Sequence, residues 1–167
     1  MAKRKPVARQ NSGPYLAAAF FCETTLTEQD GAVSAIRIVD QITLFIDPAA
    51  PSDFPSESQR MPVSIKGLLA FKTGGSPGEH SLRIALESPS GNTRTVLERT
   101  LQFPPAPHGG ANMHFDNTIW IKQGGLFWFH VFLDGAEVTR MPLQVTVQRG
   151  VPGGLTPSAP PSGSPGS

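Results

Sequence analysis

The chain has 167 residues, of which 17 are Gly and 17 are Pro, and its formal net charge at pH 7 is +1. So many helix-breaking residues exclude a long helical bundle, and the single cysteine, Cys22, excludes a disulfide scaffold. A membrane-spanning helix needs about 20 consecutive apolar residues, and the sequence has no such run. A chain so close to neutral predicts no general attraction to nucleic acid or to anionic membranes.

Composition also divides the chain into three parts. Residues 1–14 are a basic arm. Residues 150–167 are a tail with 14 Gly, Pro or Ser in 18 positions, which holds too little apolar surface to offset the entropy of ordering. Both ends are expected to be disordered around one domain at 15–149. The polar stretch after Lys5 lacks the apolar core of an export signal, and a lone cysteine suits a reducing compartment, so we expect a cytoplasmic protein.

Short apolar runs alternate with turn clusters through the domain, which is typical of strands. In chain order the expected strands are 16–24, 33–46, 63–73, 80–87, 93–103, 112–122, 126–133 and 137–148. The alanines near residue 18 would also suit a helix. Four prolines make Asp47 to Pro62 a long loop.

The last two runs form the strongest pair. Asp134-Gly135 lies between them and is a preferred hairpin turn, because Gly accepts a positive φ. Pro142 cannot donate a ladder hydrogen bond, so it indicates a bulge or an edge position. About eight short strands without a convincing helix predict an all-β fold, a two-sheet antiparallel sandwich of immunoglobulin-like or C2-like architecture.

Metal-binding and catalytic motifs are weak. His108, His114 and Asp116 lie close in sequence, but their spacing matches no compact ligand set, and exposed histidines explain them better. Single aspartates in loops, such as Asp30 and Asp47, are typical of turns rather than of a calcium site. We therefore expect no metal, no cofactor and no catalytic residue.

The aromatic run LFWFHVFL at 126–133 carries the clearest candidate surface. One face would hold Phe127 and Phe129, whereas Trp128, His130 and Phe132 would lie on the other. Two apolar faces fit a central strand that is covered on both sides. If one face is uncovered, Trp128, His130 and Phe132 form a patch for a protein partner. Stacking of a carbohydrate on Trp128 or Trp120 is an alternative.

Two segments carry a resemblance to a known family. Phe21 to Leu44 (FCETTLTEQDGAVSAIRIVDQITL) and Gly125 to Val145 (GLFWFHVFLDGAEVTRMPLQV) resemble a family of small, uncharacterised bacterial proteins with FCE, IRIVD and GLYWF-like segments and an LDG hairpin. The resemblance covers most of 16–148, and Phe127 stands where that family would have Tyr. It implies a bacterial, intracellular β-domain and no catalytic residue.

These patterns favour a non-enzymatic binding or scaffolding module that contacts an unknown protein partner or a second copy of itself. The expected surface includes Trp120, Trp128, His130 and Phe132, and the loop 47–62 is a further place to look. The alternative is a sandwich that binds a small ligand or a carbohydrate beside an exposed tryptophan. A metal-dependent hydrolase ranks last, because no nucleophile, base and orienting group can be assembled. We expect no nucleic acid or membrane partner.

Overall fold

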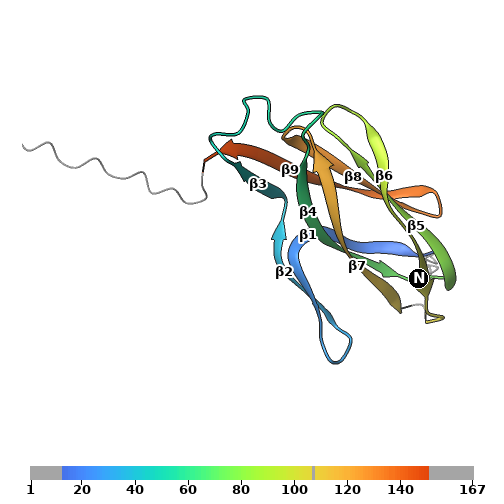
Figure 1. Ribbon diagram of the computed structural model, residues 1–167. Coiled ribbons are helices and arrows are strands. Elements are labelled where there is room, and N and C mark those ends of the chain that lie inside the picture. The colour runs from blue at the N-terminus through green and yellow to red at the C-terminus, as the bar shows by residue number, and fades with distance from the viewer. Residues whose placement is uncertain (1–12, 107, 151–167) are drawn as a thin grey trace, which may run out of the picture.

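The computed structural model describes residues 13–106 and 108–150, which hold nine strands (Figure 1). The predicted arm and tail fall almost wholly outside these residues. The strands are β1 (Tyr15–Thr27), β2 (Val33–Val39), β3 (Gln41–Ile46), β4 (Met61–Lys72), β5 (Gly78–Glu87), β6 (Thr93–Phe103), β7 (Gly110–Ile121), β8 (Gly125–Leu133) and β9 (Ala136–Arg149). Within the described ranges, no helix is long and apolar enough to span a bilayer.

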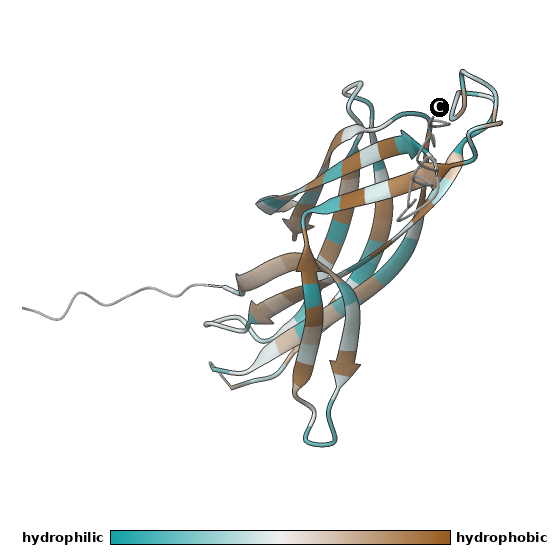
Figure 2. Ribbon diagram, turned by 90° about the vertical axis from the view of Figure 1, so that its left-hand side faces the viewer, coloured by the Kyte–Doolittle hydropathy of each residue, from teal (hydrophilic) through white to brown (hydrophobic). Residues whose placement is uncertain are grey.

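The strands form two sheets packed as a sandwich, which confirms the predicted fold class. One sheet has the order β2-β1-β4-β7, and the other, which curls around the core, has the order β3-β9-β8-β5-β6 (Figures 1 and 2). The pairing of β4 with β7 and the order β9-β8-β5 match the central strands of an immunoglobulin sandwich. All neighbouring strands pair antiparallel except β3 and β9, which are parallel.

The ninth strand arises because the predicted strand 33–46 divides at Asp40. Its first half, β2, pairs with β1, whereas its second half, β3, pairs with β9 in the other sheet. The backbone carbonyl of Asp40 accepts a hydrogen bond from the Gln144 N–H (2.9 Å), which fixes the crossover. Arg37 has a φ of 55° within β2 and forms an ion pair with Glu23 of β1 (3.3 Å).

The core lies between the sheets and follows the two-residue period of the strands. Brown and teal residues alternate along the strands in Figure 2. On β8, Phe127, Phe129, Val131 and Leu133 are all buried, and β8 lies between β9 and β5, so its predicted central position is confirmed. Asn117 closes one open side by donating its side-chain N–H to the Val96 carbonyl of β6 (2.8 Å).

Both turn predictions for the last pair are confirmed. Asp134 and Gly135 have φ of 50° and 81°, as a tight hairpin with two left-handed residues requires. Strand β9 pairs with β3 only from Gln144 onward, so at Pro142 it has β8 on one side alone. The missing N–H is therefore tolerated as it is on an edge strand.

The segment around Ala18 is a strand, not a helix, and it serves two neighbours. Tyr15 to Phe21 pair with β4, and from Phe21 onward β1 pairs with β2. The paired β1–β2 ribbon extends away from the rest of the sheet (Figure 1). It carries the exposed apolar side chains of Leu26, Ile36 and Ile38.

Candidate functional site

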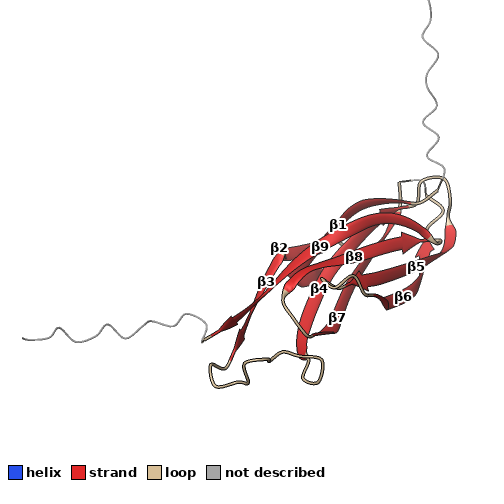
Figure 3. Cartoon of the chain, turned by 90° about the horizontal axis from the view of Figure 1, so that it is seen from above, coloured by secondary structure: helices blue, strands red, loops and turns tan. Residues whose placement is uncertain are grey.

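One end of the sandwich gathers residues from three separate parts of the sequence, 57–60, 86–94 and 120–127. The long loop 47–60 leads into β4 at the end where β7 finishes, because Met61 pairs with Ile121 (Figure 3). The turn between β5 and β6 and the start of β8 reach the same place. Together these segments enclose a cavity of about 200 Å³.

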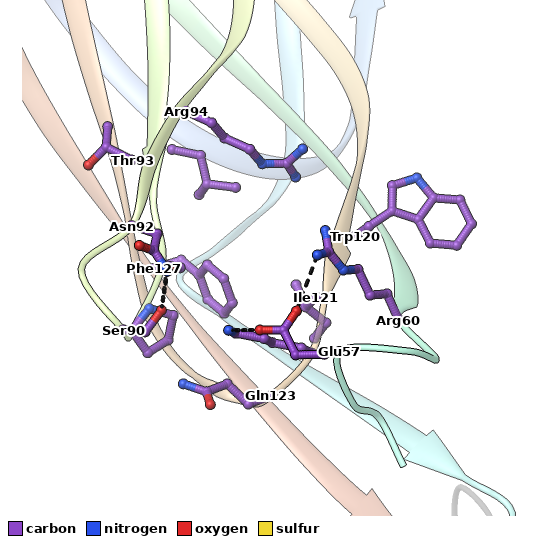
Figure 4. A pocket seen from close by; sticks show the side chains of 14 residues that line it. Glu57, Arg60, Ser90, Asn92, Thr93, Arg94, Trp120, Ile121, Gln123 and Phe127 are labelled. Carbon is purple, nitrogen blue, oxygen red and sulfur yellow. Dashed lines mark hydrogen bonds and ion pairs between the residues drawn. The ribbon is translucent and has the colours of Figure 1, made fainter. Parts of the chain in front are cut away.

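The cavity has an apolar floor and a polar rim (Figure 4). The floor consists of Leu86, Ile121 and Phe127, which the strand period directs into the core. The rim includes Glu57, Arg60, Ser90, Asn92, Arg94 and Lys122. A second, wider hollow of about 680 Å³ lies against the loop, and the two hollows share Glu57, Arg60 and Trp120.

Trp120 is the most exposed aromatic side chain at this end, with 53 % of its surface accessible. Its neighbours Ile119 and Ile121 are buried, so the alternation along β7 turns the indole to the outer face of the sheet. In Figure 4 the indole extends outward past Arg60, away from the cavity floor. A large apolar side chain therefore stands at the border of both hollows.

Ion pairs hold the loop against the strands. Glu57 binds Lys122, and its other carboxylate oxygen accepts from Arg60 Nη2 (3.2 Å). The hydrogen bond from Lys122, aided by its charge and that of Arg60, lowers the pKa of Glu57. Near the start of the loop, the Arg149 guanidinium donates to the carbonyls of Ala50 (2.7 Å) and Pro51 (2.5 Å).

The other three predicted surface residues lie on the opposite sheet, so the structure does not join them to Trp120. Trp128, His130 and Phe132 share the outer face of β8 and are partly buried. His130 contacts two carboxylates, with its Nε2 2.7 Å from Glu87 and its Nδ1 3.3 Å from Glu137.

Charged neighbours cover part of this aromatic face. The Arg83 guanidinium lies over the Phe132 ring, 3.8 Å from its centroid, and only 14 % of the His130 side chain is accessible. A role for Trp128, His130 and Phe132 in binding stays a prediction.

The histidines singled out for a metal do not form a cluster with other ligands. His114 and Asp116 are exposed on β7, and His108 is exposed in the turn before it. Asp116 instead pairs with Lys66 of β4 (3.4 Å). Among the residues that the structure describes, no group of three or more His, Cys, Asp or Glu side chains is placed to hold a metal ion.

Loop aspartates make turns, as their positions beside Gly and Pro predict. Asp30 accepts from the Ala32 N–H (2.9 Å) and Asp47 from the Ala49 N–H (2.8 Å). Asp134 accepts from the Ser81 N–H (2.9 Å) and lies 2.6 Å from the Nδ1 of His80.

Sequence reasoning named Trp120 and the loop but missed the charged side chains around them. Lys122 follows Trp120 by two residues, so the strand period could have placed both on one face. Arg94 carried no local signal, because it reaches the cavity from a strand of the other sheet.

Similarity to solved structures is distant. The chain is 11 % identical to a β-glucosidase from Listeria innocua solved with glucose, covering 50 % of this chain and 14 % of that one, with a TM-score of 0.42. For the alkylpurine DNA glycosylase AlkC from Pseudomonas fluorescens the identity is 10 % and the TM-score 0.43, and the match covers 82 % of this chain and 34 % of that one. For an immunoglobulin-like protein from Pseudomonas aeruginosa the identity is 10 % and the TM-score 0.40, and the match covers 81 % of this chain and 98 % of that one.

Sequence comparison gives a firmer result. No curated protein matches the chain. A family model described as a family of unknown function, DUF6941, matches residues 17–146, nearly the whole sandwich. The predicted kinship with an uncharacterised family is thereby confirmed, and the chain belongs to the family of unknown function DUF6941.

Proposed function

We propose that this protein is a non-enzymatic binding module that recognises a segment of another protein. Its binding site is the end of the sandwich formed by Trp120, the loop 47–60 and the cavity beside them. The observation that carries the proposal is the exposed indole of Trp120 at the border of two hollows. Trp and Arg are the side chains that most often dominate the affinity of protein interfaces, and Arg60 lies beside this Trp.

The accessible half of Trp120 offers enough apolar surface to anchor a partner. A tryptophan buries up to about 250 Å², so covering the accessible 53 % would remove about 130 Å² from water. At about 25 cal/mol per Å² that is about 3 kcal/mol, before the entropic cost of association.

The hydroxyls at the cavity support binding rather than catalysis. Ser90 lies 2.9 Å from the Ser88 hydroxyl and accepts from Asn92 (3.1 Å), so the rim hydroxyls bond to one another. Among the residues that the structure describes, no histidine lines the cavity, and a serine nucleophile needs an adjacent base. A cytoplasmic location is part of the proposal, because the buried free thiol of Cys22 suits a reducing compartment.

Selection from a displayed random-peptide library against the immobilised full chain tests this proposal. We expect enriched peptides to bind the wild type and to lose at least about tenfold in affinity on Trp120→Ala, since about 3 kcal/mol corresponds to about a hundredfold. Trp128→Ala is the matched control, because it removes the other tryptophan from the opposite sheet. Failure to enrich any peptide, or equal binding to the Trp120→Ala variant, would contradict the proposal.

The same exposed indole supports one second candidate, a carbohydrate or small ligand stacked on Trp120 beside the polar Arg60 and Glu57. A glycan array probed with the wild type and with Trp120→Ala separates the two. Binding of a defined glycan that needs Trp120, together with an empty peptide selection, would favour this candidate.

A further inference from the structure

The charged side chains around Trp120 are mostly cationic. Arg60 lines both hollows, and Arg94 and Lys122 line the first. Within the described part of the chain, Glu57 is the one carboxylate in either lining. Glu57 is already engaged, because it binds both Lys122 and Arg60. The excess of positive charge is local, since the whole chain has a formal net charge of only +1.

Arg94 is the cation of this set without an internal partner. It is exposed on β6, and among the described residues it has neither an ion pair nor a side-chain hydrogen bond. In Figure 4 the side chain of Arg94 extends toward the side on which Trp120 lies, whereas the guanidinium of Arg60 turns toward Glu57. Arginine presents a planar fork of donors that matches a carboxylate, so two such groups beside an indole favour an anionic ligand.

The lining of the cavity suits an apolar group of a bound partner. Its floor is made of Leu86, Ile121 and Phe127, and its volume of about 200 Å³ is below the range of about 300–1,000 Å³ that is typical of small-molecule sites. A space of that size suits a single side chain better than a whole ligand. The second hollow is wider and lies against the loop, so it leaves room for the residues that flank such a side chain.

We infer that the partner is an acidic peptide segment, with one apolar side chain in the cavity and flanking Asp or Glu side chains on Arg94 and Arg60. The inference rests on the proposed function and adds the chemistry of the partner. The Asp and Glu side chains of the partner would also neutralise the charge of Arg60, whose only ion-pair partner among the described residues is Glu57. Electrostatic complementarity of this kind raises the association rate and rejects basic partners.

The test uses the peptides selected on the full chain. We expect Trp120-dependent peptides to be enriched in Asp and Glu around an apolar residue, and to bind more weakly as salt is raised, because exposed charges are screened. Arg94→Glu should weaken them by at least about tenfold, since like charges across an interface are costly. Arg99→Glu is the matched control, an exposed arginine on the same strand that does not line the cavity.

Each other outcome overturns the inference in a distinguishable way. Trp120-dependent peptides that are neutral or basic, or that bind Arg94→Glu as well as Arg99→Glu, would refute the acidic partner and leave the proposed function standing. An absence of Trp120-dependent peptides would refute both. If heparin or single-stranded DNA displaced the selected peptide as well as a second acidic peptide does, the site would bind any polyanion rather than an acidic peptide.

Discussion

Gly67 is a position in the core where a single added methyl group should destabilise the sandwich. It lies on β4 between Phe21 of β1 and Phe115 of β7. A Cβ built there would lie 2.5 Å from Cζ of Phe115 and 2.8 Å from the Phe20 carbonyl oxygen. The Phe115 ring occupies the space that the missing side chain leaves, so Gly67→Ala must displace it.

The displacement would spread through an aromatic cluster in the core. Phe115 meets Phe21 edge to face at 6.2 Å, and Phe21 meets Phe129 at 4.9 Å. Overpacking costs about 1–3 kcal/mol, and each aromatic pair contributes about 0.5–1.5 kcal/mol. We expect Gly67→Ala to lower the free energy of unfolding by about 2–4 kcal/mol, or Tm by about 4–16 °C for a chain of this size.

Urea unfolding of the full chain, with Phe115→Leu as the second arm of a double-mutant cycle, checks this reasoning. A shorter side chain at position 115 relieves the clash with the new methyl group. The cost of Gly67→Ala should therefore fall by at least about 1 kcal/mol in the Phe115→Leu background. An equal cost in both backgrounds would refute the account, because the ring would not be what the methyl group meets.

Two further predictions concern stability. Thr73 is fully buried, and its hydroxyl has no hydrogen-bond partner among the described residues. Thr73→Val should therefore raise the free energy of unfolding in urea by about 1–2 kcal/mol. A loss of stability would mean that the hydroxyl has a partner. The hydrogen bond from His80 holds the pKa of Asp134 below its ordinary value of 3.8. The ionised Asp134 carboxylate therefore stabilises the fold above about pH 3.8, and this stabilisation is lost as the pH falls through the lower pKa of the folded state. Asp134→Asn, which keeps the left-handed turn, should therefore be less stable than the wild type at neutral pH, with the gap closing below that value; a gap independent of pH would contradict the linkage.

Local pattern was enough to predict most strands but not where the chain changes sheets. Apolar residues recur at every second position from Ile36 to Ile46 except at Asp40, and one polar residue in such a series does not predict a change of sheet. The crossover depends on a hydrogen bond to Gln144, more than 100 residues away in the sequence. Long-range pairing of this kind leaves no trace in a short window.

The outer face of β8 shows a second limit of sequence reasoning. The pattern of LFWFHVFL predicted correctly that β8 is a central strand. It could not show that Glu87 and Glu137 contact His130, or that Arg83 lies over Phe132, because these residues come from neighbouring strands. Part of the expected patch is thus covered by charged side chains.

The candidate site was predictable only in pieces. Trp120 and the loop 47–62 were both named from the sequence, on separate grounds. Their meeting depends on the pairing of β4 with β7 and on ion pairs such as that between Glu57 and Lys122, 65 residues apart. Arg94 joins them from the opposite sheet, so only the folded sandwich brings the set together.

Tryptophan fluorescence of the full-length Trp128→Phe variant tests the central claim most directly. The chain has two tryptophans, so this variant leaves Trp120 as the single reporter. Titration with an acidic peptide selected on the wild type should shift the Trp120 emission to shorter wavelength, saturating with the Kd that calorimetry gives. Calorimetric binding of that peptide with no change in Trp120 emission would contradict a binding site at this end of the sandwich.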